Sequence, residues 1–183
     1  MIKLLAICGS LRAASANNTL LRAAVEIAPV DIDVSIFAGL GELPHFNPDL
    51  DTDPPLEPVR ALRAAIGEAD GLLICSPEYA HGVPGVLKNA LDWLVSGVEI
   101  MHKPVALLNA SPRATHAQAS LKETLTTMAA RVLPDASLTV PISGRDLDVS
   151  GILGDPALAG TLRWALVALA AAVVGTRDET LAR

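Results

Sequence analysis

Five short apolar runs at fairly even spacing constrain the fold of this chain more than any other feature. They span residues 2–8, 31–37, 71–75, 104–110 and 137–142. Four of them are apolar nearly throughout, which is typical of strands in a parallel sheet that helices cover on both faces. The run at 31–37 alternates apolar and polar residues instead, so we expect it to form an edge strand.

The segments between these runs have helical periodicity, at residues 18–27, 57–68, 84–95, 117–132 and 155–174. Pro84 suits the first position of a helix, and Asp155 followed by Pro156 resembles an N-cap. Because strand and helix alternate and crossovers are right-handed, we expect a doubly wound sheet. We predict one flavodoxin-like α/β domain over residues 1–183, with a five-stranded parallel sheet in the order 2-1-3-4-5. In that order a ligand crevice opens at the carboxyl ends of strands 1 and 3.

Composition and charge exclude several classes of protein. Apolar residues make up 51% of the 183 residues, which argues against disorder. The formal net charge is -6, so nucleic-acid binding is not expected. The apolar run at 4–8 is too short for a secretion signal, and the longest run, at 164–174, is well below the roughly 20 residues that cross a bilayer. We therefore expect a cytoplasmic protein without membrane contact, in which Cys8 and Cys75 are buried free thiols.

The loop after the first apolar run has the composition of an anion-binding site. Residues 9–17 read GSLRAASAN. Glycine and small hydroxyl residues let backbone N–H groups approach an oxyanion at the start of a helix, and Arg12 adds a forked donor suited to phosphate. An ordinary capped turn is the alternative, and it explains Ser15 and Asn17 but not Arg12. The GxxxxGK[ST] and GxGxxG motifs are absent, and the spacing from Cys8 to Arg12 is too short for a phosphatase loop.

The loop after the third apolar run, residues 76–85, contains Tyr79, the only tyrosine of the chain. A tyrosine in a loop rich in proline and glycine at the expected crevice is more natural as the wall of a planar ligand than as core packing. His81 could act as a base, but a solvated loop histidine is the simpler interpretation. Lys88 and Asp92, four residues apart, are expected to form an ion pair on a helix surface.

Three motifs in this order resemble the NADPH-dependent FMN reductase family, which includes quinone, azo-dye and chromate reductases. They are G-S-L-R-x-x-S-x-N at residues 9–17, L-P-x-F-N-x-D at residues 43–49, and S-P-E-Y-x-x-x-x-P-G-x-L-K-N-A-L-D-W at residues 76–93. The resemblance covers about the first 110 residues well and the remainder by its strand and helix pattern.

The resemblance implies a site for FMN. It places the FMN phosphate at the first loop, the isoalloxazine ring against the third loop chiefly through backbone groups, and the pyrimidine end of the ring beside the residue just past the fourth strand. Residues 43–47 would lie near the site and a subunit contact. The implied cofactor-binding residues are Ser10, Arg12, Ser15, Asn17, Asn18, Pro77, Glu78, Tyr79 and Ser111.

The implied activity is ping-pong hydride transfer from NADPH through FMN to a small acceptor: a quinone, a free flavin, an azo dye or chromate. No side chain need act as acid or base, because the cofactor supplies the chemistry. The resemblance also implies a homodimer or homotetramer, and the apolar helix expected at 155–174 is either fully covered core or part of that interface.

Some features depart from the family pattern. The loop at 110–116 lacks the paired glycines of many relatives, and its Arg113 is either solvated or a contact for the extra phosphate of NADPH. Asp146 and Asp148 are interpreted as turn residues and not as metal ligands. A flavodoxin-like electron carrier is the main alternative function, although such carriers usually have aromatic residues on both sides of the flavin. An interaction module that keeps the fold without FMN is a third.

Overall fold

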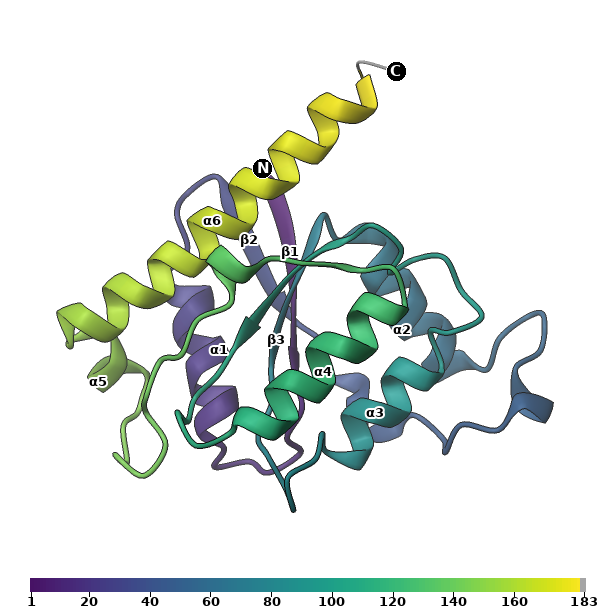
Figure 1. Cartoon of the computed structure of the whole chain (residues 1–183), viewed down its shortest axis with the longest axis horizontal. Coiled ribbons are helices and arrows are strands. Elements are labelled where there is room, and N and C mark those ends of the chain that lie inside the picture. The colour runs from purple at the N-terminus through teal and green to yellow at the C-terminus, as the bar shows by residue number, and fades with distance from the viewer. Residues whose placement is uncertain (182–183) are drawn as a thin grey trace.

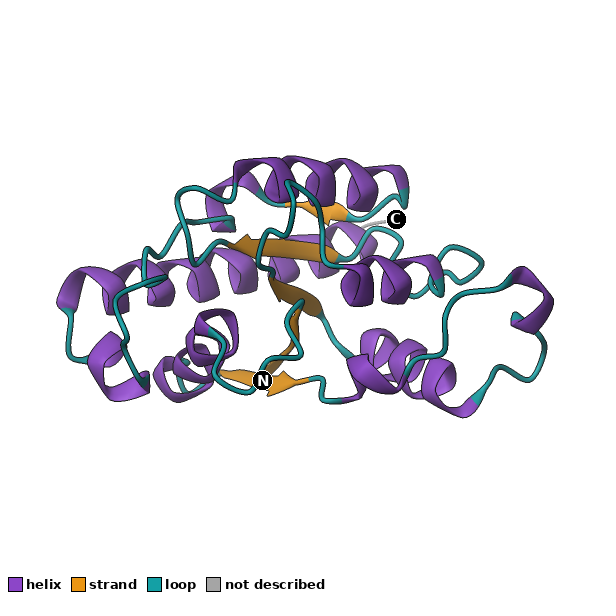
Figure 2. Cartoon of the chain, turned by 90° about the horizontal axis from the view of Figure 1, so that it is seen from below, coloured by secondary structure: helices purple, strands orange, loops and turns teal. Residues whose placement is uncertain are grey.

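The computed structural model describes residues 1–181, with side chains described as far as Thr176. The sheet contains five parallel strands in the order β2-β1-β3-β4-β5, as predicted (Figures 1 and 2). The strands are β1 (Ile2–Cys8), β2 (Ile32–Ile36), β3 (Gly71–Cys75), β4 (Pro104–Leu108) and β5 (Arg131–Val132). β2 lies at one edge, so the prediction from its alternating sequence is confirmed.

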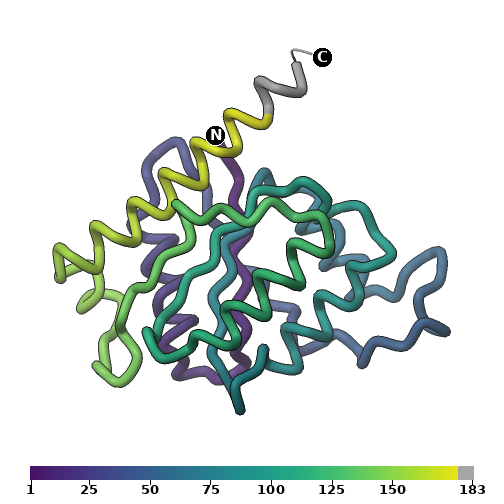
Figure 3. The backbone as a smooth tube through the Cα atoms, in the orientation of Figure 1, coloured from purple at the N-terminus to yellow at the C-terminus, as the bar shows by residue number. Residues whose placement is uncertain are grey.

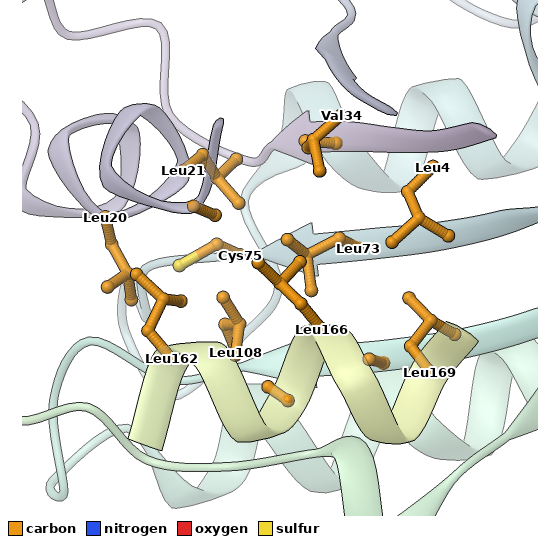
Figure 4. Packing of buried hydrophobic residues seen from close by; sticks show 14 of the residues in the cluster. Leu4, Leu20, Leu21, Val34, Leu73, Cys75, Leu108, Leu162, Leu166 and Leu169 are labelled. Carbon is orange, nitrogen blue, oxygen red and sulfur yellow. The ribbon is translucent and has the colours of Figure 1, made fainter. Parts of the chain in front are cut away.

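Helices cover both faces of the sheet, which explains why the central strands are apolar throughout. One face packs against α1 (Ala16–Ile27), α5 (Val149–Leu153) and α6 (Pro156–Leu181), as Figure 4 shows for part of this cluster. The other face packs against α2 (Glu57–Glu68), α3 (Gly85–Asp92) and α4 (Thr115–Thr127). Side chains of β3 alternate between the two layers: Leu73 and Cys75 face α1 and α6, whereas Leu72 and Ile74 face the opposite layer. The prediction for a doubly wound fold is therefore confirmed.

The fifth strand lies earlier in the chain than expected. The sequence predicts a strand at 137–142 and a helix as far as residue 132, but α4 ends at Thr127 and residues 131–132 pair with β4. Ala129, with φ of 60°, reverses the chain after the helix. Pro134 has no N–H to donate to a strand ladder, and a short 3-10 helix at Pro134–Ala136 follows. From the predicted strand, Thr139 forms an isolated bridge to Asn109.

A long excursion between β2 and α2, residues 37–56, packs onto α3 (Figure 3). The carbonyl oxygen of Pro44 accepts hydrogen bonds from Trp93 Nε1 at 2.8 Å and from Asn89 Nδ2 at 2.9 Å. Asn89 Oδ1 in turn accepts from the Phe46 amide at 2.7 Å. The second and third sequence motifs are therefore joined physically: the polar side chains at the end of the third motif hold the second.

The helix α6 is apolar around much of its circumference. Over residues 156–176 its mean hydropathy is 1.9, so by length and composition alone it could cross a membrane. A core helix of a soluble fold passes the same test, and one face of α6 is buried on the sheet through Leu162, Leu166 and Leu169. The outward face is exposed, and we call residues 157, 160, 164, 167, 171 and 174 on it the outward stripe. Of the two alternatives for this helix, the fully covered core helix does not hold on this face, where Trp164 is 61% exposed.

Candidate functional site

A crevice opens where the strand order reverses, at the carboxyl ends of β1 and β3. It consists of two adjoining cavities of about 620 Å³ and 290 Å³, which share Asn17, Pro77 and Ser143 as lining residues. Crevices at this position are the usual ligand sites of doubly wound sheets. The larger cavity is lined by Ser10, Arg12, Ser15, Asn17, Pro77 and Tyr79, and the smaller by Asn17, Pro77, Glu78 and Ser111, among others. Of the nine predicted residues, Asn18 alone does not line either cavity.

The amino terminus of α1 forms one end of the larger cavity. Ser15 occupies the N-cap position, but its side chain makes no capping hydrogen bond, and the first turn contains no acidic residue. Within the described chain, the amides of Ala16, Asn17 and Asn18 have no hydrogen-bond acceptor. Free amides and the helix dipole together attract an anion. The Asn18 amide is one of these free amides, although Asn18 lines neither cavity.

Arg12 adds a positive charge at this end. Its side chain is exposed and forms no ion pair with a described residue. Its backbone amide donates to Ser10 Oγ at 3.3 Å, which shapes the turn in front of the helix. A capped turn alone does not explain the position of the guanidinium, whereas a bound phosphate would accept hydrogen bonds from both the guanidinium and the helix amides.

Two buried thiols lie beneath this end of the crevice. Cys8 and Cys75 are register partners at the ends of β1 and β3, and both are free, as predicted. The Cys75 thiol donates to Asn17 Oδ1 at 3.1 Å. Burial raises the pKa of the Cys75 thiol well above its ordinary value, and the neighbouring Cys8 raises it further. Burial also raises the pKa of Cys8, against the opposing effect of hydrogen bonds with Ser10 and Ser15. Both sulfurs are therefore protonated and poorly suited to nucleophilic chemistry.

The third loop forms a tight turn at the mouth of the crevice. Tyr79 and Gly82 exchange backbone hydrogen bonds of 3.2 and 2.9 Å, and Ala80 and His81 between them have φ of 50° and 60°. Two consecutive left-handed residues form the turn that suits a two-residue hairpin. Tyr79 is 57% exposed and lines the larger cavity, so it is a wall residue and not part of the core. The His81 ring stacks on His116 with centroids 4.3 Å apart.

Glu78 connects the third loop to the start of α4. Its Oε2 accepts a hydrogen bond from the Ala117 amide at 2.8 Å, near the amino terminus of that helix. The N-cap residue of α4, Ala114, has no side chain that could do this. Since the carboxylate is used in this way, Glu78 offers chiefly its backbone to the crevice.

The fourth loop closes the smaller cavity with Ser111 and Arg113. Asn109, buried just past β4, accepts a hydrogen bond from the Ser111 amide at 3.0 Å. Sequence reasoning missed Asn109 and Ser76 as lining residues, although each is polar and follows an apolar strand. It also missed residues 143–148, of which several line the larger cavity.

Asp146 and Asp148 lie in a turn and also line the larger cavity. Asp148 Oδ1 accepts from the Gly151 amide at 2.7 Å and from Ser150 Oγ at 2.8 Å, which caps α5. These hydrogen bonds, the Gly151 amide first, lower the pKa of Asp148. Asp146 has φ of 51°, as befits a turn. Within the described residues, no group of three histidine, cysteine or acidic side chains could hold a metal ion.

The segment at 43–47 and the pair on α3 lie outside the crevice. Residues 43–47 pack on α3 and do not line either cavity. Lys88 and Asp92 form the expected ion pair across one turn of α3. Such exposed pairs contribute little to stability.

The donor set fits a phosphate ester that carries a planar ring. Free helix amides, a guanidinium and the Asn17 amide face one end, and a tyrosine with adjoining loop backbone faces the other. Two adjoining cavities of this kind can together accommodate an extended ligand.

Comparisons with known proteins agree with this geometry. The family model for NADPH-dependent FMN reductase matches residues 2–144. A 2-hydroxy-1,4-benzoquinone reductase of a Burkholderia species is 47% identical over 92 residues, which cover 50% of this chain and 49% of that protein. An NAD(P)H-dependent FMN reductase of Pseudomonas aeruginosa is 34% identical over 161 residues, with 84% and 85% covered.

The structural comparison extends over nearly the whole chain. The flavoenzyme FerB, an NAD(P)H:(acceptor) oxidoreductase from Paracoccus denitrificans, superposes with a TM-score of 0.84 at 28% identity, covering 96% of this chain and 98% of that one. Some curated relatives are matched over a smaller part: this chain spans about half the length of the Burkholderia reductase. The motifs, the crevice and the family match together show that this chain belongs to the NADPH-dependent FMN reductase family, whose members are oxidoreductases.

Proposed function

We propose that the protein is an FMN-dependent NAD(P)H oxidoreductase that reduces a quinone or a similar small acceptor, such as a free flavin, an azo dye or chromate, in a ping-pong sequence. The observation that carries this proposal is the amino terminus of α1, which has no side-chain cap and lies beside Arg12 at the larger cavity. The names of the relatives, a quinone reductase among them, support the class of acceptor.

The residues present fit FMN. Ser10, Arg12, Ser15 and Asn17 would hold its phosphate together with the first amides of α1, among them that of Asn18. Pro77, Glu78 and Tyr79 would border the ring, Glu78 through its backbone, and Ser111 would lie at the pyrimidine end.

When bound, FMN supplies the redox chemistry, accepting a hydride from NAD(P)H and passing electrons to the acceptor. The chain's own groups position the reactants and offer amide dipoles to developing negative charge. No side chain need act as acid or base, and the raised pKa values of Cys8 and Cys75 argue against a thiolate at the site.

A non-enzymatic electron carrier is the less favoured function. Carriers of this fold usually enclose the ring between aromatic side chains, whereas this chain has a single tyrosine. Rapid bleaching of the flavin absorbance on mixing with NADPH, followed by its return when a quinone is added, is expected for the enzyme and not for the carrier.

We also propose that the protein is a cytoplasmic homodimer or homotetramer. The outward stripe supports self-association, because residues 157, 160, 164, 167, 171 and 174 repeat with the three- and four-residue spacing of a helix–helix seam, and none of them is charged. A monomeric mass for the wild type in solution would contradict this part of the proposal.

The decisive experiment measures FMN binding by the purified protein and its Arg12→Ala variant. We expect the wild type to bind FMN and to oxidise NADPH when a quinone is present. Loss of a charge-assisted hydrogen bond should weaken FMN binding by about 10- to 100-fold in Arg12→Ala. Arg60→Ala is the matched control, because Arg60 is exposed on α2 and pairs with Glu57 away from the crevice. A wild type that refuses FMN, or equal FMN affinity of Arg12→Ala and wild type, would contradict the proposal.

A further inference from the structure

We propose that Cys75 is a positioning residue for the FMN phosphate: its thiol holds the Asn17 side chain so that the amide nitrogen faces the crevice as a donor. This inference rests on the proposed function, because the phosphate is the group that Asn17 would meet. It assigns a further role to a buried thiol that also packs in the hydrophobic cluster between the sheet, α1 and α6.

The geometry brings the two side chains together beneath the crevice. Cys75 is the last residue of β3 and is fully buried, and Figure 4 shows its sulfur on the α1 side of the cluster, near Leu20. Asn17, the second residue of α1, is 7% exposed and lines both cavities. The distance from Cys75 Sγ to Asn17 Oδ1 is 3.1 Å, within hydrogen-bonding range for sulfur.

The hydrogen bond determines which end of the Asn17 amide meets a ligand. A side-chain amide has one acceptor atom and one donor atom on opposite sides. The thiol occupies the acceptor, Oδ1, while Nδ2 has no partner among the described residues and is not sealed from solvent. In the opposite orientation, Oδ1 would face the incoming anion and repel it. The thiol therefore favours the orientation in which the amide donates to a phosphate.

The thiol suits this task because it stays protonated. Desolvation raises the pKa of Cys75 well above its ordinary value, so the sulfur keeps its proton at neutral and moderately alkaline pH. A neutral donor can remain buried at a lower desolvation cost than a charged one.

The test compares the affinities of FMN and riboflavin, which differ by the phosphate, in Cys75→Ala and Cys75→Ser. Binding is followed by quenching of flavin fluorescence. Loss of one neutral hydrogen bond predicts that Cys75→Ala binds FMN about fivefold more weakly while its affinity for riboflavin is unchanged. Cys75→Ser keeps a donor and should restore most of the affinity for FMN. Leu73→Val, which trims a buried side chain on the same face of β3, is the packing control and should leave the FMN-to-riboflavin ratio unchanged.

A double-mutant comparison separates positioning from general loosening. If Cys75 acts through Asn17, then Cys75→Ala should have no further effect on FMN affinity in an Asn17→Ala background. An equal loss of FMN and riboflavin affinity, no loss of FMN affinity, or an undiminished loss in the Asn17→Ala background would each overturn the inference. Failure of the wild type itself to bind FMN would instead overturn the proposed function, and this inference with it.

Discussion

Replacing Glu78 by alanine should loosen the junction between the third loop and α4. In the structure, Glu78 Oε2 accepts from the Ala117 amide at 2.8 Å, and Ala114 at the N-cap position cannot replace it. The substitution leaves one of the first amides of the helix without its acceptor. It also removes a negative charge from the positive end of the helix dipole.

The magnitude follows from the cost of losing a helix cap. Removal of a side-chain cap costs about 1 kcal/mol, and water can partly replace the carboxylate because Glu78 is half-buried. For a chain of 183 residues, this free energy corresponds to a decrease of about 2–4 °C in Tm. Thermal unfolding followed by circular dichroism measures it directly.

Two control variants make the Glu78 result interpretable. Glu78→Gln keeps an acceptor oxygen without the charge, so it should lose less stability than Glu78→Ala. Glu123→Ala removes an exposed carboxylate from the same helix and should change Tm by less than Glu78→Ala does. The reasoning fails if Glu78→Ala matches the wild type in Tm, or if Glu78→Gln is as destabilised as Glu78→Ala.

Three further predictions concern other parts of the molecule. Arg113→Ala should raise the KM for NADPH more than that for NADH, since Arg113 lines the smaller cavity and could meet the extra phosphate; an unchanged ratio of the two KM values would remove this role. Cys8 and Cys75 should react slowly with a thiol reagent in the native protein and rapidly in denaturant, because burial raises both pKa values; rapid labelling of the native protein would contradict this. Asp148→Asn should lower the free energy of unfolding at neutral pH. Because the folded pKa of Asp148 is lowered, its contribution is present above the ordinary aspartate pKa and is lost as pH falls through the folded value, so the difference between the variants should vanish in acid.

The sequence predicted the sheet well where burial alone decides the pattern. β1, β3 and β4 are covered on both faces, so their residues are apolar without interruption. The sequence did not predict β5, because this edge strand has only two residues and gives too short a pattern. The longer apolar run at 137–142 was predicted as the strand instead, but it lies after the break that Pro134 introduces. Local patterns do not show which of two neighbouring segments completes a sheet.

The candidate site was predictable where loops directly follow strands. Eight of the nine predicted residues line the crevice through their side chains or backbone, since the loops after β1, β3 and β4 converge at one edge of the sheet. The cap that Glu78 provides for α4 was not predictable, because it joins residues 39 positions apart. The wall formed by residues 143–148 was also missed, because its position depends on the path of the chain from β5 to α5, which local sequence patterns do not show.

The turn at Ala80 and His81 leaves the mouth of the crevice free to change in evolution. Both residues adopt a left-handed backbone that glycine and asparagine tolerate more readily, and backbone hydrogen bonds between Tyr79 and Gly82 close the turn whatever side chains stand between them. Substitutions at these two positions can therefore relieve strain or alter the rim, while the other end of the crevice, at the amino terminus of α1, keeps its free amides and the Arg12 guanidinium. The turn at the mouth of the crevice and the amino terminus of α1 can therefore change independently in proteins that descend from this one.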